Sequence, residues 1–183
     1  MYILAINGSP HKNGSGSLLI KTVLDAARKN GHSAEVVNLY DKKISGCLAC
    51  NKCKDSTPDC AVKDDMAAIT TKIAKAGAIV ISSPVYMGQI TGPMKTFLDR
   101  WCAFFDGSFK MRVVPGKKLV TIVTSGAPAK AYQSVSESLD KLLAGFFKLK
   151  PAGSLVVGNA GGPGALKKQP AVLKKAEAIG RAL

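Results

Sequence analysis

Four of the five cysteines lie within fourteen residues of one another, and their spacing is the strongest chemical signal in the sequence. They are Cys47, Cys50, Cys53 and Cys60. Thiolates two residues apart can converge on one centre, and soft thiolate ligands suit an iron–sulfur cluster or zinc. No signal-peptide pattern precedes them, so we expect a cytoplasmic, reducing environment in which structural disulfides are rare. The sequence therefore predicts metal binding or thiol redox chemistry in a cysteine-rich loop at about residues 44–62.

The cysteine spacing favours iron over zinc, because zinc sites more often pair two CxxC units across a longer loop. A run of three closely spaced cysteines is similar to the start of a bacterial ferredoxin ligand run. Zinc, a redox disulfide and free thiols stay open as alternatives to a [4Fe–4S] cluster. The fifth cysteine, Cys102, lies on an apolar helical stripe between Trp101 and Phe105, so we interpret it as a core residue.

Three loops rich in small residues follow predicted strands and could hold a phosphorylated ligand. The first, residues 7–17, leads into a helix, whose N-terminal amides and dipole attract phosphate. It matches neither the Walker loop nor GxGxxG. The second loop begins Ser-Ser-Pro-Val-Tyr-Met-Gly at Ser82, and the third is Ser-Gly-Ala-Pro at residues 125–128. We interpret three such loops at one sheet edge as a mononucleotide site.

The elements that must position these loops alternate between short apolar runs and helix-period stripes. The predicted strands are Tyr2–Ile6, Ala34–Leu39, Ala78–Ile81, Leu119–Thr124 and Leu155–Val157. The predicted helices cover about residues 18–26, 66–76, 94–105, 135–146 and 172–179. This alternation predicts a single α/β domain over residues 1–183, a three-layer sandwich around a five-stranded parallel sheet. A flavodoxin-like order, 2-1-3-4-5, fits this count and places ligands beyond the carboxyl ends of the strands.

The formal net charge is +14, and the excess is concentrated after residue 109, where 13 basic residues face 3 acidic ones. A positive field accelerates the association of acidic partners, so we expect an acidic electron carrier such as ferredoxin. Candidate contacts, chosen because they flank the predicted loops, are Lys117, Lys118, Lys130, Lys167 and Lys168. The basic residues are scattered without an aromatic-rich stripe, which disfavours nucleic-acid binding. No apolar run is long enough to cross a bilayer, so we expect no membrane segment.

At three of these segments the chain resembles a known family. Residues 8–14, 83–88 and 91–100 are similar to the NADPH-dependent FMN reductase family of flavodoxin-like proteins. With the four cysteines and the following Asp64-Asp65-Met66, the chain resembles the iron–sulfur flavoproteins. That resemblance extends over nearly the whole length and includes the glycine-rich residues 161–165.

The resemblance implies particular roles for loop residues. The FMN phosphate would be held by Ser9, His11, Asn13, Ser15 and Ser17. The isoalloxazine would lie beside Pro84, Val85, Tyr86, Met87 and Gly88, with Ser125, Gly126 and Ala127 on its other side. The four clustered cysteines would be metal ligands. Two departures predict weaker FMN binding: His11 stands where the family usually has Arg, and Ser15-Gly16 where it often has Asn-Thr.

The resemblance further implies an FMN-dependent oxidoreductase in which a [4Fe–4S] cluster relays electrons between FMN and a one-electron carrier. It implies a homodimer or homotetramer in which one subunit's cluster approaches another subunit's flavin, with NAD(P)H as a candidate substrate. The first alternative is a cluster-free NAD(P)H-dependent FMN, quinone or azo-compound reductase. The second is a redox-sensing flavin-binding module without turnover.

Overall fold

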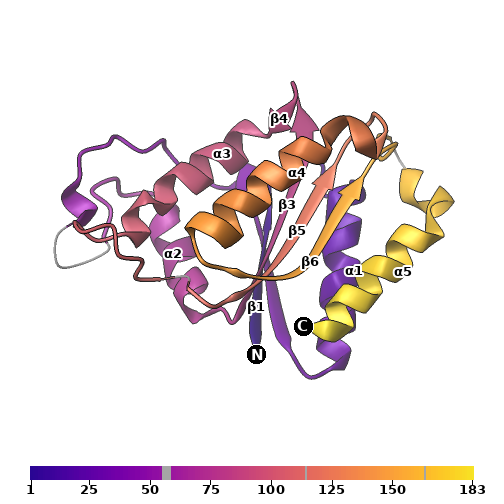
Figure 1. The fold of residues 1–183 in the computed structure, drawn as a ribbon, viewed down its shortest axis with the longest axis horizontal. Coiled ribbons are helices and arrows are strands. Elements are labelled where there is room, and N and C mark those ends of the chain that lie inside the picture. The colour runs from indigo at the N-terminus through magenta and orange to yellow at the C-terminus, as the bar shows by residue number, and fades with distance from the viewer. Residues whose placement is uncertain (55–58, 114, 163) are drawn as a thin grey trace.

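A parallel sheet lies between two helical layers in the computed structural model, which describes residues 1–54, 59–113, 115–162 and 164–183 (Figure 1). The strand order is β2-β1-β3-β5-β6. The bounds of these strands are Tyr2–Asn7 for β1, Ser33–Asn38 for β2, Ala78–Tyr86 for β3, Lys118–Thr124 for β5 and Lys150–Val157 for β6. A two-residue strand, β4 (Gln89–Ile90), pairs antiparallel with the end of β3. The predicted flavodoxin-like order is confirmed, with β5 and β6 as the fourth and fifth parallel strands.

The helices cover the two faces of the sheet in separate groups. On one face lie α1 (Ser15–Lys29) and α5 (Pro170–Ala182). On the other face lie α2 (Met66–Lys75), α3 (Gly92–Asp99) and α4 (Gln133–Asp140). Successive residues of β1 alternate between the two cores, as the pleat requires: Ile3 and Ala5 join one cluster, Leu4 and Ile6 the other. Short 3₁₀ turns occur at Leu39–Asp41, Lys52–Lys54, Arg100–Phe104, Ala129–Tyr132 and Ala165–Lys168.

Several predicted boundaries differ from the structure; strand β3, for example, ends at Tyr86 rather than at Ile81. The predicted helix over residues 94–105 changes at Arg100 into a 3₁₀ turn, in which Trp101 and Phe104 remain fully buried. The predicted helix over residues 135–146 changes after Asp140 into a π-helix, Lys141–Phe146. Strand β6 begins at Lys150, five residues earlier than predicted. Pro151 argued against a strand at these residues, but β6 lies at the edge of the sheet, where proline is tolerated.

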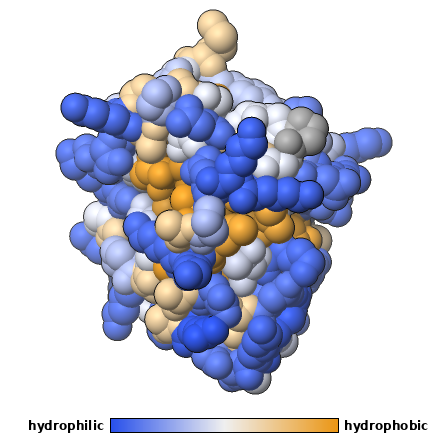
Figure 2. All heavy atoms as spheres, turned by 90° about the vertical axis from the view of Figure 1, so that its right-hand side faces the viewer, coloured by the Kyte–Doolittle hydropathy of each residue, from blue (hydrophilic) through white to orange (hydrophobic). Residues whose placement is uncertain are grey.

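Polar side chains dominate much of the surface at the α5 end of the molecule. Figure 2 shows hydrophilic groups surrounding a band of hydrophobic atoms on that side. No helix in the described ranges has both the length and the apolar composition that crossing a membrane requires.

Candidate functional site

The carboxyl ends of β1, β3, β5 and β6 border a pocket of about 690 Å³, a volume typical of small-molecule sites. Nine of the thirteen residues predicted to contact flavin line it: Ser9, His11, Asn13, Ser15, Pro84, Val85, Tyr86, Ser125 and Gly126. The lining residues that were not predicted are Pro10, Lys12, Gly14, Gly16, Thr124, Ala160, Gly161 and Gly162. Ser17, Met87, Gly88 and Ala127 are absent from the lining.

The first loop is held in shape by the buried side chain of Asn7. Its Oδ1 accepts a hydrogen bond from the Ser9 amide at 3.1 Å, and its Nδ2 donates to Ser17 Oγ at 3.1 Å. Ser9 Oγ in turn accepts from the His11 amide at 3.1 Å. The loop therefore needs little rearrangement to receive a ligand, and Ser17 contributes to its shape from outside the pocket.

The N-terminus of α1 offers backbone donors to the pocket. Its N-cap is Gly14, no side chain of the described residues caps it, and its first turn contains no acidic residue. The Ser15 hydroxyl donates to Ala160 O at 2.8 Å, and the Ser17 hydroxyl donates to His11 O at 3.1 Å. Since both hydroxyl protons are engaged, the first amides of the helix are the donors left for an anion.

Gly16 allows the start of α1 to approach the sheet closely. A Cβ atom at Gly16 would lie 2.9 Å from Ser82 Oγ, which is buried and has no hydrogen-bond partner within the described ranges. A side chain at this position would require Ser82 Oγ to shift. Gly16 therefore lets the first turn of α1 lie directly against β3.

A permanently charged residue, Lys12, is among the residues that line the pocket, beside the exposed His11. Lys12 Nζ lies 2.9 Å from the carboxylate of Asp41, and both side chains remain largely exposed. Sequence reasoning considered only His11 as the replacement for the family's arginine. The adjacent lysine was the available signal, although its ammonium group is paired with Asp41 in this structure.

The second loop forms a tight hairpin between β3 and β4. Met87 and Gly88 have φ values of 48° and 79°, as a two-residue turn of this kind requires. Met87 is fully exposed at the tip, whereas Pro84, Val85 and Tyr86 line the pocket. Met87 and Gly88 therefore lie outside the pocket lining, and the turn that they form positions Tyr86 at the pocket.

The loops after β5 and β6 are hydrogen-bonded to each other. The Ala160 amide donates to Ser125 O at 2.8 Å, and the Asn159 amide donates to Ala127 O at 3.0 Å. Ala127 thus contributes to this part of the site through its backbone carbonyl, which accepts one of these hydrogen bonds. Residues 160–162 of the second of these loops line the pocket, and their signal in the sequence was a glycine-rich turn directly after a strand. Residue 163 of that glycine-rich segment lies outside the described residues.

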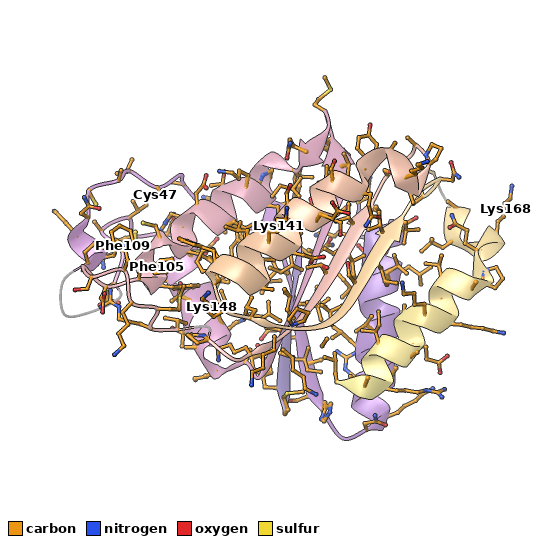
Figure 3. All side chains as sticks on the ribbon, viewed as in Figure 1. Cys47, Phe105, Phe109, Lys141, Lys148 and Lys168 are labelled. Atoms are coloured by element: carbon orange, nitrogen blue, oxygen red, sulfur yellow. The ribbon has the colours of Figure 1, made fainter. Side chains whose placement is uncertain are left out.

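The segment that contains the clustered cysteines lies at the end of α3 away from the β3–β4 hairpin (Figure 1), and Figure 3 labels Cys47 there. Cys47 and Cys50 are exposed, Cys53 is buried and Cys60 is partly buried. Within the described ranges, which omit residues 55–58 of this segment, no three cysteine, histidine or acidic side chains lie close enough to hold a metal. The donor set nonetheless fits a cluster in its chemistry, because thiolates are the ligands that iron–sulfur clusters take.

The backbone around Cys50 has an unusual conformation that suits a sulfur-ligated centre. Ala49 and Asn51, on either side of Cys50, have φ values of 51° and 58°. Left-handed residues are costly outside glycine and occur preferentially at functional sites.

Cys53 is anchored independently of the other cysteines. Its carbonyl accepts a hydrogen bond from Arg112 Nη2 at 2.6 Å, and Lys54 Nζ donates to Cys102 O at 2.5 Å. Burial raises the pKa of the Cys53 thiol, an effect that Lys54 opposes and that the nearby Cys102 and Cys60 reinforce. Cys102 itself is partly exposed, although we expected a core residue.

The lysines proposed as contacts for a carrier divide between two edges of the sheet. Lys117 and Lys118 lie at the amino end of β5, where Lys117 donates to Ala76 O at 2.6 Å and Lys118 to Leu183 O at 2.6 Å. Their choice as neighbours of the pocket was wrong, because they precede the strand whose far end borders it. Lys130, Lys167 and Lys168 follow β5 and β6, beyond the carboxyl ends of these strands, and are not among the residues that line the pocket.

Comparisons with known proteins agree with this geometry. The family model described as NADPH-dependent FMN reductase matches residues 1–163. An iron–sulfur flavoprotein of Archaeoglobus fulgidus is 36% identical over 126 residues, which cover 69% of this chain and 60% of that protein. Another iron–sulfur flavoprotein, from Methanosarcina thermophila, is 30% identical over 138 residues, 75% of this chain and 72% of that protein.

A solved structure has the same fold at low sequence identity. The NAD(P)H:quinone oxidoreductase from Methanothermobacter marburgensis superposes with a TM-score of 0.76 at 17% identity. The superposition covers 99% of this chain and 96% of that one. The matching family model and the similarity to iron–sulfur flavoproteins show that this chain belongs to the NADPH-dependent FMN reductase family.

Proposed function

We propose that this protein is an FMN-dependent oxidoreductase that exchanges electrons between a two-electron partner, with NAD(P)H as a candidate, and a one-electron carrier. The observation that carries the proposal is the pocket at the carboxyl edge of the sheet, bordered by four loops of small and hydroxyl-bearing residues. FMN, when bound, supplies the hydride and single-electron chemistry, so no nucleophilic side chain is needed.

The residues of the chain bind and orient FMN in this proposal. The amides at the start of α1, together with Lys12, would hold the phosphate. Pro84, Val85 and Tyr86 would flank one side of the ring, and Ser125 and Gly126 the other. Ser17, Met87, Gly88 and Ala127 would act by shaping the loops, since the pocket lining omits them.

We further propose that Cys47, Cys50, Cys53 and Cys60 hold a [4Fe–4S] cluster in a homodimer or homotetramer. The names of the two relatives and the bent backbone around Cys50 support this. The separation of the cysteines from the pocket along α3 is compatible with a partner subunit's flavin lying closer to them. The second candidate is a cluster-free NAD(P)H-dependent FMN or quinone reductase, favoured by the dispersed thiols of the described residues.

Anaerobic purification followed by FMN titration tests the proposal directly. Bound FMN should show quenched fluorescence and micromolar or tighter affinity. Failure to bind at about 1 mM FMN, equivalent to about 4 kcal/mol, would rule out the flavin site. Iron and sulfide in the protein favour the relay, whereas steady NADPH oxidation by a quinone without iron favours the second candidate. Bound flavin without any NAD(P)H oxidation would identify a redox-sensing module instead.

The Lys12→Met substitution should weaken FMN binding about tenfold while leaving the fold intact. The reason is the loss of the permanent charge at the phosphate loop. Fluorescence titration measures the change. Lys21→Met, at an exposed ion pair with Asp25 on α1, is the matched control and should bind FMN as the unmodified protein does. Equal affinities in the two variants would exclude Lys12 from the phosphate site.

An acidic carrier should dock at the pocket edge near Lys130, Lys167 and Lys168. We expect its rate of electron exchange to fall steeply with salt, because ions screen charges over about 8–10 Å at ordinary ionic strength. Stopped-flow measurements with reduced ferredoxin would record the rate. Lys168→Glu should lower it further at low salt, whereas Lys75→Glu, at the opposite edge, should not. A rate independent of salt would remove the docking proposal.

A further inference from the structure

A buried ion pair lies beside the cysteine segment. Arg100 Nη1 donates to Asp64 Oδ2 at 2.6 Å, and Nη2 donates to Asp64 Oδ1 at 3.2 Å. The side chains are only 1% and 8% exposed. Such a two-pronged arrangement fixes the relative orientation of both groups, and burial makes the loss of either partner costly.

The same pair joins the two ends of the segment that carries the cysteines. Arg100 Nη1 also donates to Ser45 O at 2.8 Å, and Nη2 donates to Val62 O at 3.2 Å. The carboxylate of Asp64 accepts from the Ser45 amide at 2.9 Å. Ser45 precedes Cys47 by two residues, and Val62 follows Cys60 by two. One ion pair therefore closes the loop that contains all four clustered thiols.

Arg100 also lies near one of those thiols, Cys60, which affects its pKa. Burial would lower the pKa of Arg100, but the hydrogen bonds and charge of Asp64 and the interaction with Cys60 raise it instead. Arg100 Nε is buried and has no hydrogen-bond partner in the part of the chain that the structure describes. The guanidinium therefore brings a buried positive charge close to the cysteine segment.

The helix that ends at Arg100 begins at the flavin pocket. Thr91, the N-cap of α3, donates its hydroxyl proton to Gly8 O at 2.8 Å, and its amide donates to Ser83 Oγ at 3.0 Å. The eight residues of α3 rise about 12 Å before Arg100. Figure 1 shows α3 extending from the β3–β4 hairpin to the cysteine segment. A continuous, well-packed element thus connects the phosphate loop with the ion pair.

We propose that the Arg100–Asp64 pair is the positioning element of the cysteine segment: it closes the base of the segment, restrains Cys60 through the bond to Val62 O and sets the distance of the thiols from the flavin pocket. The identity of the group that the thiols bind rests on the function proposed above, whereas the positioning role of the ion pair does not. Cys53 should depend less on the pair, since Arg112 and Lys54 anchor it separately.

Thiol labelling of the reduced, metal-free, FMN-loaded protein tests the positioning role. Maleimide labelling rates, resolved for each cysteine by mass spectrometry, should rise at least fivefold at Cys60 in Arg100→Met. The exposed Cys47 and Cys50 serve as internal standards. The affinity for FMN should stay within twofold of the unmodified value. After anaerobic reconstitution, iron and sulfide per chain should fall by half or more.

Two further variants make the test decisive. Lys95→Met breaks an exposed pair with Asp99 on the same helix and should change neither labelling nor iron content. Arg100→Met/Asp64→Leu removes the pair without leaving a buried charge, which protects the fold if the single variant is unstable. Labelling of Cys60 within twofold of the unmodified protein in this double variant overturns the proposal. If the unmodified protein takes up no iron, the cluster is excluded, and the labelling rates still decide the role of the pair.

Discussion

Replacing Ser9 with aspartate is expected to abolish FMN binding, raising the dissociation constant at least a hundredfold, or about 2.8 kcal/mol. Ser9 lies in the pocket lining and is only 7% exposed, so the new carboxylate would face the phosphate with little screening. The new side chain would also disturb the hydrogen bond that Ser9 Oγ accepts from the His11 amide. Titration followed by flavin fluorescence measures the effect.

Ser138→Asp is the matched control for this prediction, because it adds the same charge to an exposed position on α4, away from the pocket. It should bind FMN like the unmodified protein. Binding by Ser9→Asp within tenfold of that value would mean that the phosphate does not lie against the first loop.

Replacing Cys50 with serine is expected to remove most of the iron and sulfide while leaving FMN affinity unchanged. The loss follows because a cluster with four thiolate ligands tolerates poorly the exchange of one soft ligand for a hard hydroxyl. FMN should be unaffected, since the cysteine segment and the pocket are at opposite ends of α3. Iron, sulfide and flavin assays on anaerobically purified protein give the three quantities.

Cys102→Ser provides the control for the cysteine prediction. Cys102 contributes to the environment of Cys53 but belongs to a different segment, the 3₁₀ turn after α3. We expect it to keep its iron. An equal loss of iron in both variants would mean that iron binding depends on Cys102 as much as on Cys50, and the ligand assignment would change.

Local patterns in the sequence were enough to predict the layers of the fold and three of the loops around the pocket. Parallel strands covered on both faces must be apolar, so β1, β3 and β5 are recognisable from residue type alone. Glycine and serine after β1 signalled the phosphate loop for a similarly local reason, because only small residues let the backbone close around a ligand.

Which residues line the pocket depends on tertiary contacts that no local sequence pattern encodes. Ser17 has the right chemistry, but Asn7 and His11 use its hydroxyl to shape the loop. Residues 160–162 reach the pocket because the loops after β5 and β6 are hydrogen-bonded to each other.

For the cysteines, the sequence by itself predicted which thiols act together, since the spacing of candidate ligands is a property of the chain. Only the tertiary structure decided where they lie. It placed them at the far end of α3 and brought Arg100 from a distant segment to Asp64 and Cys60. The physical reason is that a buried charge must find its partner wherever the fold supplies one, and the sequence does not state which residues will be neighbours.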